Sequence, residues 1–451
     1  MNLPEDFVRE TRLVMGEQRF NRFMGAFTEE APVSIRLNPR ALEDCPSCEQ
    51  RATATELHRD CPRCALAAGE VPWCPEGFYL SGRPQFTFDP LFHAGCYYVQ
   101  EAASMFVTHV IRSVIASDPA NRSNLVPHSS FLIPHSSFLI PHSSFLIPRN
   151  ALDLCAAPGG KSTAMRTVLP EGSLLVSNEP IPTRAQILLE NITKWGWPDC
   201  IVTNNYPRDF RKTKAQFDLI LCDVPCSGEG MFRKDPDTIS EWSLQNVEKC
   251  WRLQREIVAD AWECLVPGGI FIYSTCTFNI KENEENVRWI LENFDAEVLE
   301  VPVDPGWNIT GSLLPGFDAP VYRFIPGITR SEGLFLCVLR KFGGTGVRGY
   351  GGARYDYRQI KGLSILVPPY HRTPAPPTVD LSYQDALRYL RGEALILPAD
   401  NPRGIATVTY RGVPLGPVKN IGSRANNLYP KPWRIKTTHL PSEPVEIIYK
   451  Q

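Results

Sequence analysis

The sequence has little of what marks a membrane or secreted protein. No apolar run approaches the roughly 20 residues that a membrane-spanning helix needs, and the opening MNLPEDFVRE carries acids where a signal peptide requires a positive region. It also lacks an excess of either charge, since 47 basic and 49 acidic residues give a net charge of -2. A near-neutral total argues against a polybasic, histone-like protein but is compatible with local basic patches. We therefore expect a soluble, cytoplasmic protein without a membrane partner. We also expect it to be a monomer.

Cysteines are too few and too irregularly placed for a disulfide framework, although the chain of 451 residues has 14 of them. In a reducing compartment such cysteines are thiols or metal ligands. Cys45, Cys48, Cys61 and Cys64 form two Cys-x-x-Cys pairs separated by 12 residues, a pattern typical of structural zinc. The alternative is a solvent-exposed loop insertion that binds no metal, because the segment between the pairs has few apolar residues to pack around one.

Short apolar segments alternate with helical patterns in the middle of the chain. Strands are predicted over residues 151–155, 173–178, 200–204, 217–221 and 269–275, and helices over residues 162–169, 182–195 and 242–265. This alternation indicates an α/β fold with a parallel, doubly wound sheet. Residues 333–340 are predicted to close the sheet as an antiparallel strand.

Composition divides the chain into four parts. Residues 1–95 are predicted to form an N-terminal extension with the four-cysteine insertion, residues 96–341 the sheet domain, residues 342–375 a linker that begins rich in glycine, and residues 376–451 a small C-terminal domain. Within the sheet domain, residues 127–148 hold the heptapeptide PHSSFLI in three tandem copies. A proline in every copy excludes a coiled coil, so we expect a low-complexity surface insertion.

Two cysteines follow predicted strands at the same relative place. Cys226 comes shortly after Asp223 and Pro225, where proline ends the strand, and Cys276 follows the strand predicted over residues 269–275. Ligands and catalytic groups collect at the carboxyl ends of strands in open α/β sheets. A free cysteine is most often a small buried hydrophobe, but two strand-end thiols facing one cleft indicate thiolate chemistry on an electrophilic ring.

The turn after the first strand of the sheet has the sequence CAAPGGKS. Its Gly-Lys-Ser ending invites comparison with a triphosphate-binding loop, but that motif needs a glycine where this chain has Cys155. What remains is a glycine turn, Gly159 and Gly160, where a ligand can approach the backbone at a helix N-terminus. Glu179 ends the second strand and is placed to accept hydrogen bonds from ribose hydroxyls. These features favour S-adenosylmethionine as the cofactor.

Three motifs, CAAPGGK, DVPCSGEGMFRKD and STCTFN, together resemble the Sun and nucleolar-protein family of RNA cytosine-5 methyltransferases, over roughly residues 70–340. The ending RGVPLGPVKNIGSRANNLYPKPWRIK is similar to the C-terminal PUA-like module of the bacterial RsmF type, which modifies small-subunit ribosomal RNA. The resemblance implies a Rossmann-like sheet that uses S-adenosylmethionine, flanked by an N-terminal RNA-binding extension and a C-terminal PUA-like RNA-binding domain.

The resemblance also implies roles for particular residues. Cys276 is the expected nucleophile, Cys226 assists product release, and Asp223 and Lys161 complete the expected catalytic set. The expected contacts of S-adenosylmethionine are Cys155, Ala156, Ala157, Pro158, Gly159, Gly160, Lys161, Glu179, Arg184 and Asp223.

Some features depart from the family pattern. In NNYPRDF, where an acid is expected to contact the adenosine, this chain has Tyr206, with Asp209 three residues later. The four-cysteine insertion and the PHSSFLI repeat also lie outside the pattern.

The chemistry of cytosine supports a role for a thiol. Carbon 5 is a poor nucleophile until a group adds at carbon 6, and a thiolate is the side chain best suited to that addition. Asp223 could hydrogen-bond the ring as charge develops. The base must be unstacked before a cysteine can reach its face, which favours single-stranded or remodelled RNA. Residues 411–436 hold six basic residues and no acid, interleaved with Tyr429 and Trp433, which is typical of RNA contact or of a solvated charged face.

Other functions share parts of this pattern. Transfer RNA is the alternative to a small-subunit ribosomal RNA substrate. A protein or small-molecule methyltransferase would share the cofactor pocket without needing paired cysteines, and a non-catalytic RNA-binding subunit would need neither cysteine motif. DNA cytosine methyltransferases use a Pro-Cys thiol as the nucleophile, which would assign the attack to Cys226 instead of Cys276.

Overall fold

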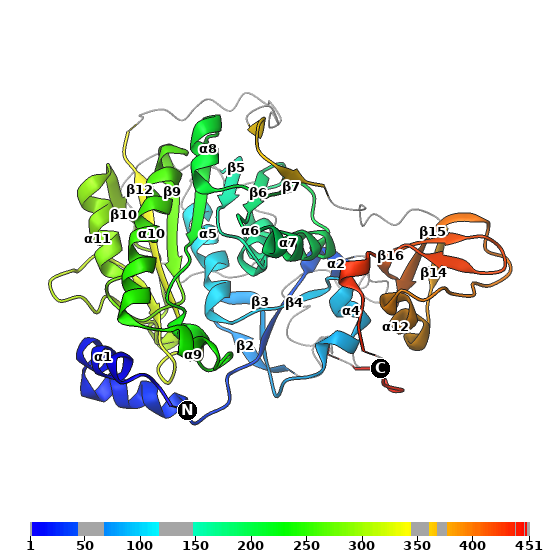
Figure 1. The fold of residues 1–451 in the computed structure, drawn as a ribbon, viewed down its shortest axis with the longest axis horizontal. Coiled ribbons are helices and arrows are strands. Elements are labelled where there is room, and N and C mark those ends of the chain that lie inside the picture. The colour runs from blue at the N-terminus through cyan, green and yellow to red at the C-terminus, as the bar shows by residue number, and fades with distance from the viewer. Residues whose placement is uncertain are drawn as a thin grey trace.

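The computed structural model describes residues 2–43, 67–116, 148–343, 360–367, 377–437, 439–445 and 447–448, which form three sheets with surrounding helices (Figure 1). Cys45, Cys48, Cys61 and Cys64 lie outside the described residues, as do all three copies of PHSSFLI. The predictions about both segments therefore stay predictions. Across the described ranges, no helix combines the length and apolar content that crossing a membrane requires.

A nine-stranded sheet forms the centre of the molecule, in the order β10-β12-β9-β8-β5-β6-β7-β13, with β11 paired to β12 outside this path. Its strands are β5 (Asn150–Asp153), β6 (Leu174–Asn178), β7 (Cys200–Thr203), β8 (Phe217–Asp223), β9 (Leu265–Thr275), β10 (Ala296–Val298), β11 (Tyr322–Phe324), β12 (Leu334–Lys341) and β13 (Ile365–Leu366). Strands β5 to β9 are parallel, and the other four pair antiparallel with their neighbours. The predicted α/β class and the antiparallel strand over residues 333–340 are confirmed, but β10 lies beyond that strand, so it does not close the sheet.

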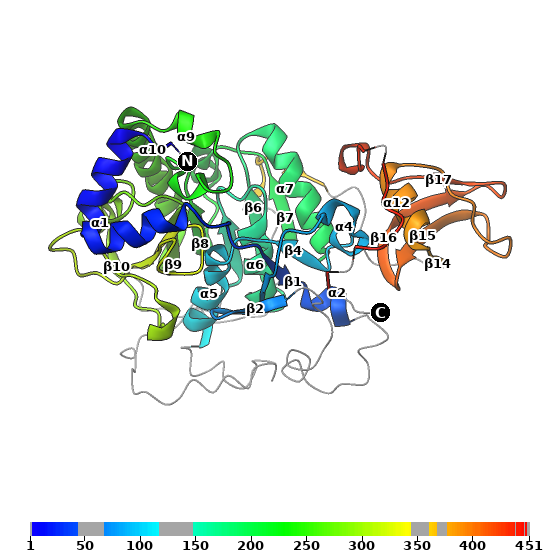
Figure 2. The same ribbon diagram turned by 90° about the horizontal axis from the view of Figure 1, so that it is seen from below.

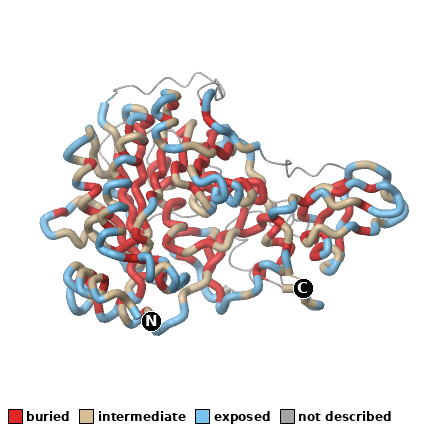
Figure 3. The backbone as a smooth tube through the Cα atoms, viewed as in Figure 1, coloured by how far each residue is buried: buried red, intermediate tan, exposed pale blue. Residues whose placement is uncertain are grey.

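Helices cover both faces of this sheet, because successive residues of a buried strand point to opposite sides. In β8, Leu219 and Leu221 belong to the same core as α5 (Phe106–Ala116) and α6 (Gly160–Val168). Ile220 belongs to the core beneath α10 (Leu244–Glu263) and α11 (Glu284–Asn293). The remaining helices around the sheet are α7 (Pro182–Trp195), α8 (Pro207–Thr213) and α9 (Thr238–Glu241). Figure 3 shows the strands as a largely buried layer.

The N-terminal helix α1 (Glu5–Ala26) bends at Gly16, whose φ of 70° is unfavourable for a residue with a side chain. Its apolar face packs on the segments that follow β8 and β9. The Phe23 ring, for example, lies 5.0 Å from the ring of Phe278, centroid to centroid. Figures 1 and 2 both show α1 at the end of the molecule opposite the C-terminal sheet. Leu13 belongs to the apolar pattern that predicted this helix, but it is 74% exposed because it lies on the outer face.

A second, four-stranded sheet has the order β2-β3-β1-β4. Its elements are β1 (Ser34–Leu37), α2 (Pro39–Glu43), β2 (Ala67–Val71), β3 (Cys74–Leu80), α4 (Pro90–His93) and β4 (Tyr97–Val99). The buried guanidinium of Arg36 fixes this sheet to the central domain. It donates to Thr163 Oγ1 on α6 at 2.6 Å, and its Cζ lies 4.4 Å from the centre of the Trp195 ring on α7. The N-terminal sheet therefore packs directly on the helix that follows the CAAPGGKS turn.

The third sheet has the order β14-β15-β16-β17 and packs with α12. Its elements are β14 (Thr378–Asp380), α12 (Tyr383–Arg391), β15 (Gly404–Tyr410), β16 (Val413–Asn420) and β17 (Ala425–Asn427). Tyr429 and Trp433, which we expected among the RNA contacts, are only 2% and 8% exposed. They are core residues, so stacking of their rings on bases is excluded in this conformation. Their core is continuous with residues of the N-terminal sheet such as Leu37 and Phe78.

Candidate active site

The two strand-end cysteines meet at the carboxyl edge of the central sheet. Strands β8 and β9 pair in parallel with Asp223 opposite Ser274, so the loops that follow them leave the sheet side by side. The Sγ atoms of Cys226 and Cys276 lie 3.2 Å apart, and the Cys276 backbone N–H donates to Cys226 Sγ at 3.4 Å. Both cysteines are free and partly exposed. Packing alone would bury such residues, so their partial exposure suits a reactive role.

The surroundings of Cys226 favour its protonated form. The hydrogen bond with Cys276 raises the pKa of Cys226 well above its ordinary value, and burial raises it further. Cys226 therefore keeps its proton at neutral pH, and its S–H group can donate to the sulfur of Cys276. Such a donor stabilises negative charge on Cys276, which is what a thiolate nucleophile needs.

A lysine and an aspartate stand beside the thiols. Lys161 Nζ lies 2.8 Å from Asp223 Oδ2, and the Ser274 hydroxyl donates to Asp223 Oδ1 at 2.6 Å. Burial alone would lower the pKa of Lys161, but the charge of Asp223 outweighs it and leaves the pKa above its ordinary value. The ammonium therefore stays charged. Lys161 lies in the first turn of α6, so this ion pair joins the cysteines to the CAAPGGKS turn.

The CAAPGGKS turn is held tightly against α7. Gly159 has a φ of 114°, and a Cβ built on it would lie 3.2 Å from Leu188 Cδ1. Arg184 donates to the carbonyl of Ala157 at 3.1 Å, and Asn191 donates to that of Pro158 at 2.8 Å. Glycine is therefore required at position 159 both by the backbone conformation and by the close approach.

Two buried acids border this turn. Glu179 follows β6, accepts from the backbone N–H of Ile181 at 3.0 Å and pairs with Arg184 at 3.5 Å. Asp153 ends β5, and its Oδ2 accepts from the Ser162 hydroxyl at 2.6 Å. Its Oδ1 is buried and has no hydrogen-bond partner within the described part of the chain. Burial raises the pKa of Asp153 to about 7. We did not single out Asp153 from the sequence, although an acid at the end of the first strand is a usable signal.

The structure thus brings the predicted residues into two adjoining groups. One holds Cys226, Cys276, Asp223 and Lys161, and the other holds the turn, Glu179 and Arg184. Tyr206, by contrast, is 57% exposed. Its backbone N–H donates to the carboxylate of Asp209 at the start of α8.

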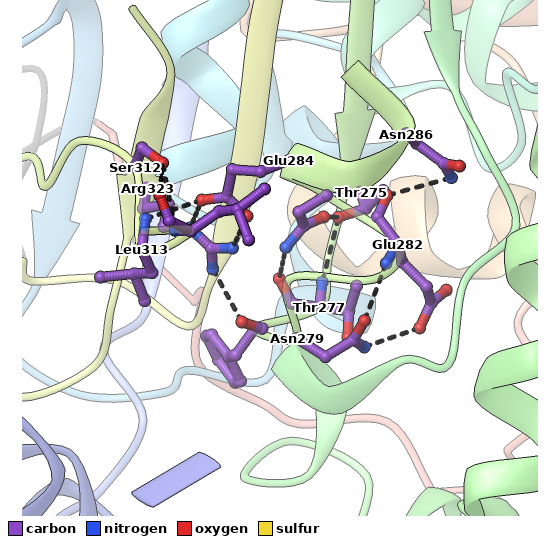
Figure 4. A network of polar contacts seen from close by, with 12 residues as sticks. Thr275, Thr277, Asn279, Glu282, Glu284, Asn286, Ser312, Leu313 and Arg323 are labelled. Atoms are coloured by element: carbon purple, nitrogen blue, oxygen red, sulfur yellow. Dashed lines mark hydrogen bonds and ion pairs between the residues drawn. The ribbon is translucent and has the colours of Figure 1, made fainter. Parts of the chain in front are cut away.

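Polar contacts hold the loop that carries Cys276, as Figure 4 shows. Asn283 accepts from the Thr275 hydroxyl at 2.6 Å and donates to the carbonyl of Thr277 at 2.9 Å. Arg323 forms a buried ion pair with Glu284 and donates to the carbonyl of Phe278 at 2.8 Å. Asn283, Glu284 and Arg323 were not singled out from the sequence, and Arg323 reaches this loop only through the fold. Among the side chains that the structure describes, no group of three or more His, Cys, Asp or Glu is arranged to hold a metal.

A parallel sheet with a glycine turn after its first strand and an acid after its second is a Rossmann-like fold. Three solved structures share it. PH0851 has a TM-score of 0.57 and 20% identity, and the match covers 75% of this chain and 66% of that one. NSun6 from Pyrococcus horikoshii with SFG has a TM-score of 0.54 and 20% identity, with 76% of this chain and 99% of that one covered. A methyltransferase homologue from Pyrococcus horikoshii has a TM-score of 0.53 and 23% identity, with 75% of this chain and 100% of that one covered. At these identities the likeness shows the fold alone.

Sequence comparisons identify the family. Three family models match the chain. The model of the N-terminal domain of 16S rRNA methyltransferase RsmF matches residues 3–102, and that of 16S rRNA methyltransferase RsmB/F matches residues 145–340. The model of the methyltransferase RsmF PUA domain matches residues 376–435. The chain belongs to the RsmF-type family of methyltransferases, which confirms the resemblance drawn from the motifs.

Two relatives illustrate how far the similarity extends. Ribosomal RNA small subunit methyltransferase F of Cronobacter sakazakii is 32% identical over 283 residues, 60% of this chain and 51% of the relative. The protein of the same name from Salmonella heidelberg is 29% identical over 441 residues, 93% of this chain and 81% of the relative. In the first comparison the chain therefore spans about half the length of the relative.

Proposed function

We propose that this protein transfers a methyl group from S-adenosylmethionine to carbon 5 of a cytosine in small-subunit ribosomal RNA, through a covalent bond between Cys276 and the base. The observation that carries the proposal is the contact of two free, partly exposed thiols, 3.2 Å apart, beside the Lys161–Asp223 pair. Methylation of a heteroatom needs no such pair, whereas methylation of carbon 5 needs a nucleophile at carbon 6 and a means to release it.

The residues around the glycine turn fit a nucleoside-containing cofactor. Gly159 precedes the N-terminus of α6, where backbone N–H groups can receive a ligand, and the absence of a side chain lets the turn pack against Leu188. Asp153 Oδ1 is a buried acceptor without a partner in the described residues, and such an atom calls for a donor. The turn, Glu179 and Arg184 would hold S-adenosylmethionine, which would supply an electrophilic methyl group.

The protein residues then have distinct roles. Cys276 Sγ, as a thiolate, adds to carbon 6 and makes carbon 5 nucleophilic. After methylation, carbon 5 loses its proton to a base, the Sγ–carbon 6 bond breaks, and the double bond between carbons 5 and 6 reforms. The Cys226 S–H group stabilises the departing Cys276 thiolate, and the Lys161–Asp223 pair orders the polar groups beside the ring.

The flanking units are proposed to bind the RNA. Residues 1–95 and residues 376–451 would act as the N-terminal and C-terminal RNA-binding units on either side of the catalytic residues 96–341. Residues 342–375, which include β13 of the central sheet, connect the catalytic residues to the C-terminal unit. Since Tyr429 and Trp433 are core residues, the C-terminal unit would contact the RNA through its basic side chains, which would bind phosphates. A monomer in the cytoplasm fits this role, and a transfer RNA substrate is the second candidate.

Nucleoside mass analysis tests the proposal. Purified protein is incubated with S-adenosylmethionine and with unmodified small-subunit ribosomal RNA, assembled subunits or transfer RNA, and the RNA is digested. We expect 5-methylcytidine from the ribosomal substrate and none with Cys276→Ala. If only transfer RNA is methylated, the substrate is transfer RNA and not ribosomal RNA. A methylated product other than 5-methylcytidine would overturn the proposed reaction.

A further inference from the structure

Two buried glutamates connect the loop that carries Cys226 to the loop that carries Cys276. Glu229 lies three residues after Cys226, and Glu282 lies six residues after Cys276. Both are buried, with 2% and 0% exposure. Neither belongs to the residues that the mechanism uses, and buried carboxylates are rare unless they are hydrogen-bonded.

Glu229 reaches from the first loop into the second. Its Oε2 accepts from the backbone N–H groups of Phe278 and Asn279 at 2.6 and 3.1 Å. Its Oε1 accepts from Trp242 Nε1 and from Asn279 Nδ2, both at 2.9 Å. One carboxylate thus fixes the backbone two and three residues after Cys276.

Glu282 reaches in the opposite direction. Its Oε2 accepts from the backbone N–H of Ser227, the residue after Cys226, at 3.0 Å, and from Gln254 Nε2 at 2.7 Å. Its Oε1 accepts from Asn279 Nδ2 at 2.8 Å, so Asn279 donates to both carboxylates. Figure 4 shows Glu282 directed toward Asn279 beside the Cys276 loop.

The pattern is reciprocal, because each loop sends a carboxylate to the backbone of the other. We propose that Glu229 and Glu282 are positioning residues that hold the two cysteine loops in register and so fix the contact between Cys226 and Cys276. The consequence for turnover rests on the proposed function. With the loops in register, Cys276 can attack carbon 6 of the cytosine and Cys226 can assist release of the methylated base.

Glutamine is the most informative replacement for Glu229 and Glu282. Every partner of both carboxylates is a hydrogen-bond donor, so an amide NH2 group at either position would face a donor and lose at least one hydrogen bond of the network that includes Asn279. The side-chain volume hardly changes. An error of about 1 Å in the placement of reacting groups can slow a reaction by up to about a hundredfold.

The contact between the thiols can be measured without any RNA. Hydrogen peroxide oxidises two neighbouring thiols to a disulfide, which takes two hydrogens from the cysteines and yields two waters. The rate of appearance of the Cys226–Cys276 disulfide peptide is followed by mass spectrometry in the full-length protein and in Glu229→Gln and Glu282→Gln. We expect disulfide formation to slow by about tenfold or more in both variants, with S-adenosylmethionine affinity unchanged. The exposed Glu256→Gln serves as the matched control.

The same variants are then assayed for methylation. We expect kcat to fall while the KM for S-adenosylmethionine stays constant, and Glu282→Gln to accumulate protein attached to RNA. Disulfide formation at the wild-type rate in both variants would overturn the proposal. If they fail to fold, Asn279→Ala decides it, since loss of the shared donor should slow disulfide formation too. A wild-type protein without methyltransferase activity would refute the proposed function but leave the disulfide result valid.

Discussion

Glu282 should make the stability of the protein depend on pH. Burial and the neighbouring Glu229 raise its pKa from 4.5 to about 7. The folded protein therefore holds a proton on Glu282 that the unfolded chain has already lost between these two values. The free energy of unfolding should accordingly fall as pH rises from about 4.5 to about 7, and this contribution should level off above pH 7.

The size of the effect follows from the pKa. At about 1.4 kcal/mol for each pH unit between the two pKa values, Glu282 contributes up to about 3 kcal/mol to the loss. Glu282→Gln carries no titrating proton, so its unfolding free energy should fall less steeply between pH 5 and pH 7. Asp153, whose pKa burial also raises to about 7, adds a slope common to both proteins.

Urea unfolding followed by tryptophan fluorescence, at pH 5, 6, 7 and 8, measures these slopes. Glu256→Gln, an exposed change on the helix that carries Gln254, should follow the wild-type curve. Parallel curves for wild type and Glu282→Gln would refute the reasoning, because they would mean that Glu282 titrates alike in the folded and unfolded states.

Three further outcomes are expected. Gly159→Ala should weaken S-adenosylmethionine binding, measured by calorimetry, by about tenfold or more. A side chain at this φ costs about 1–3 kcal/mol and meets Leu188, so the turn should relax in the free protein, and binding must restore its conformation at that cost. Gly172→Ala has a similar strain with open space around it and should leave the affinity unchanged. Deleting residues 127–147 should leave cofactor affinity and thermal stability unchanged, and a large drop in Tm would show that the repeat is structural. If Cys45, Cys48, Cys61 and Cys64 form a zinc site, protein purified without chelator should contain about one zinc per chain, and substoichiometric zinc would contradict this.

The elements that the sequence predicted well are those with strong local signals. Residues 217–221 are a continuous apolar run, and Pro225 ends the strand by removing a backbone donor. Because parallel strands end at one edge, the positions of Cys226 and Cys276 after two such strands were enough to predict that they lie near each other. The structure adds their 3.2 Å contact.

The features that the sequence did not predict depend on tertiary contacts. The burial of Glu229 and Glu282 could not be predicted, although Glu229 lies within the motif DVPCSGEGMFRKD, because it depends on donors such as Gln254 and Asn279 that the fold brings to them. Trp433 lies among basic residues, but composition cannot say which side chains turn inward, and this one packs in the core. Strand β13 has two residues, too few to show a period.

The central claim is that Cys276 attacks the base and Cys226 releases it. The most direct test incubates wild type, Cys226→Ala and Cys276→Ala with substrate RNA and S-adenosylmethionine, and then separates the protein on a denaturing gel. Cofactor binding is confirmed for each variant beforehand. We predict a slow-migrating species with Cys226→Ala that RNase digestion collapses, and no such species with Cys276→Ala. An adduct with Cys276→Ala and none with Cys226→Ala would contradict the account and make Cys226 the nucleophile.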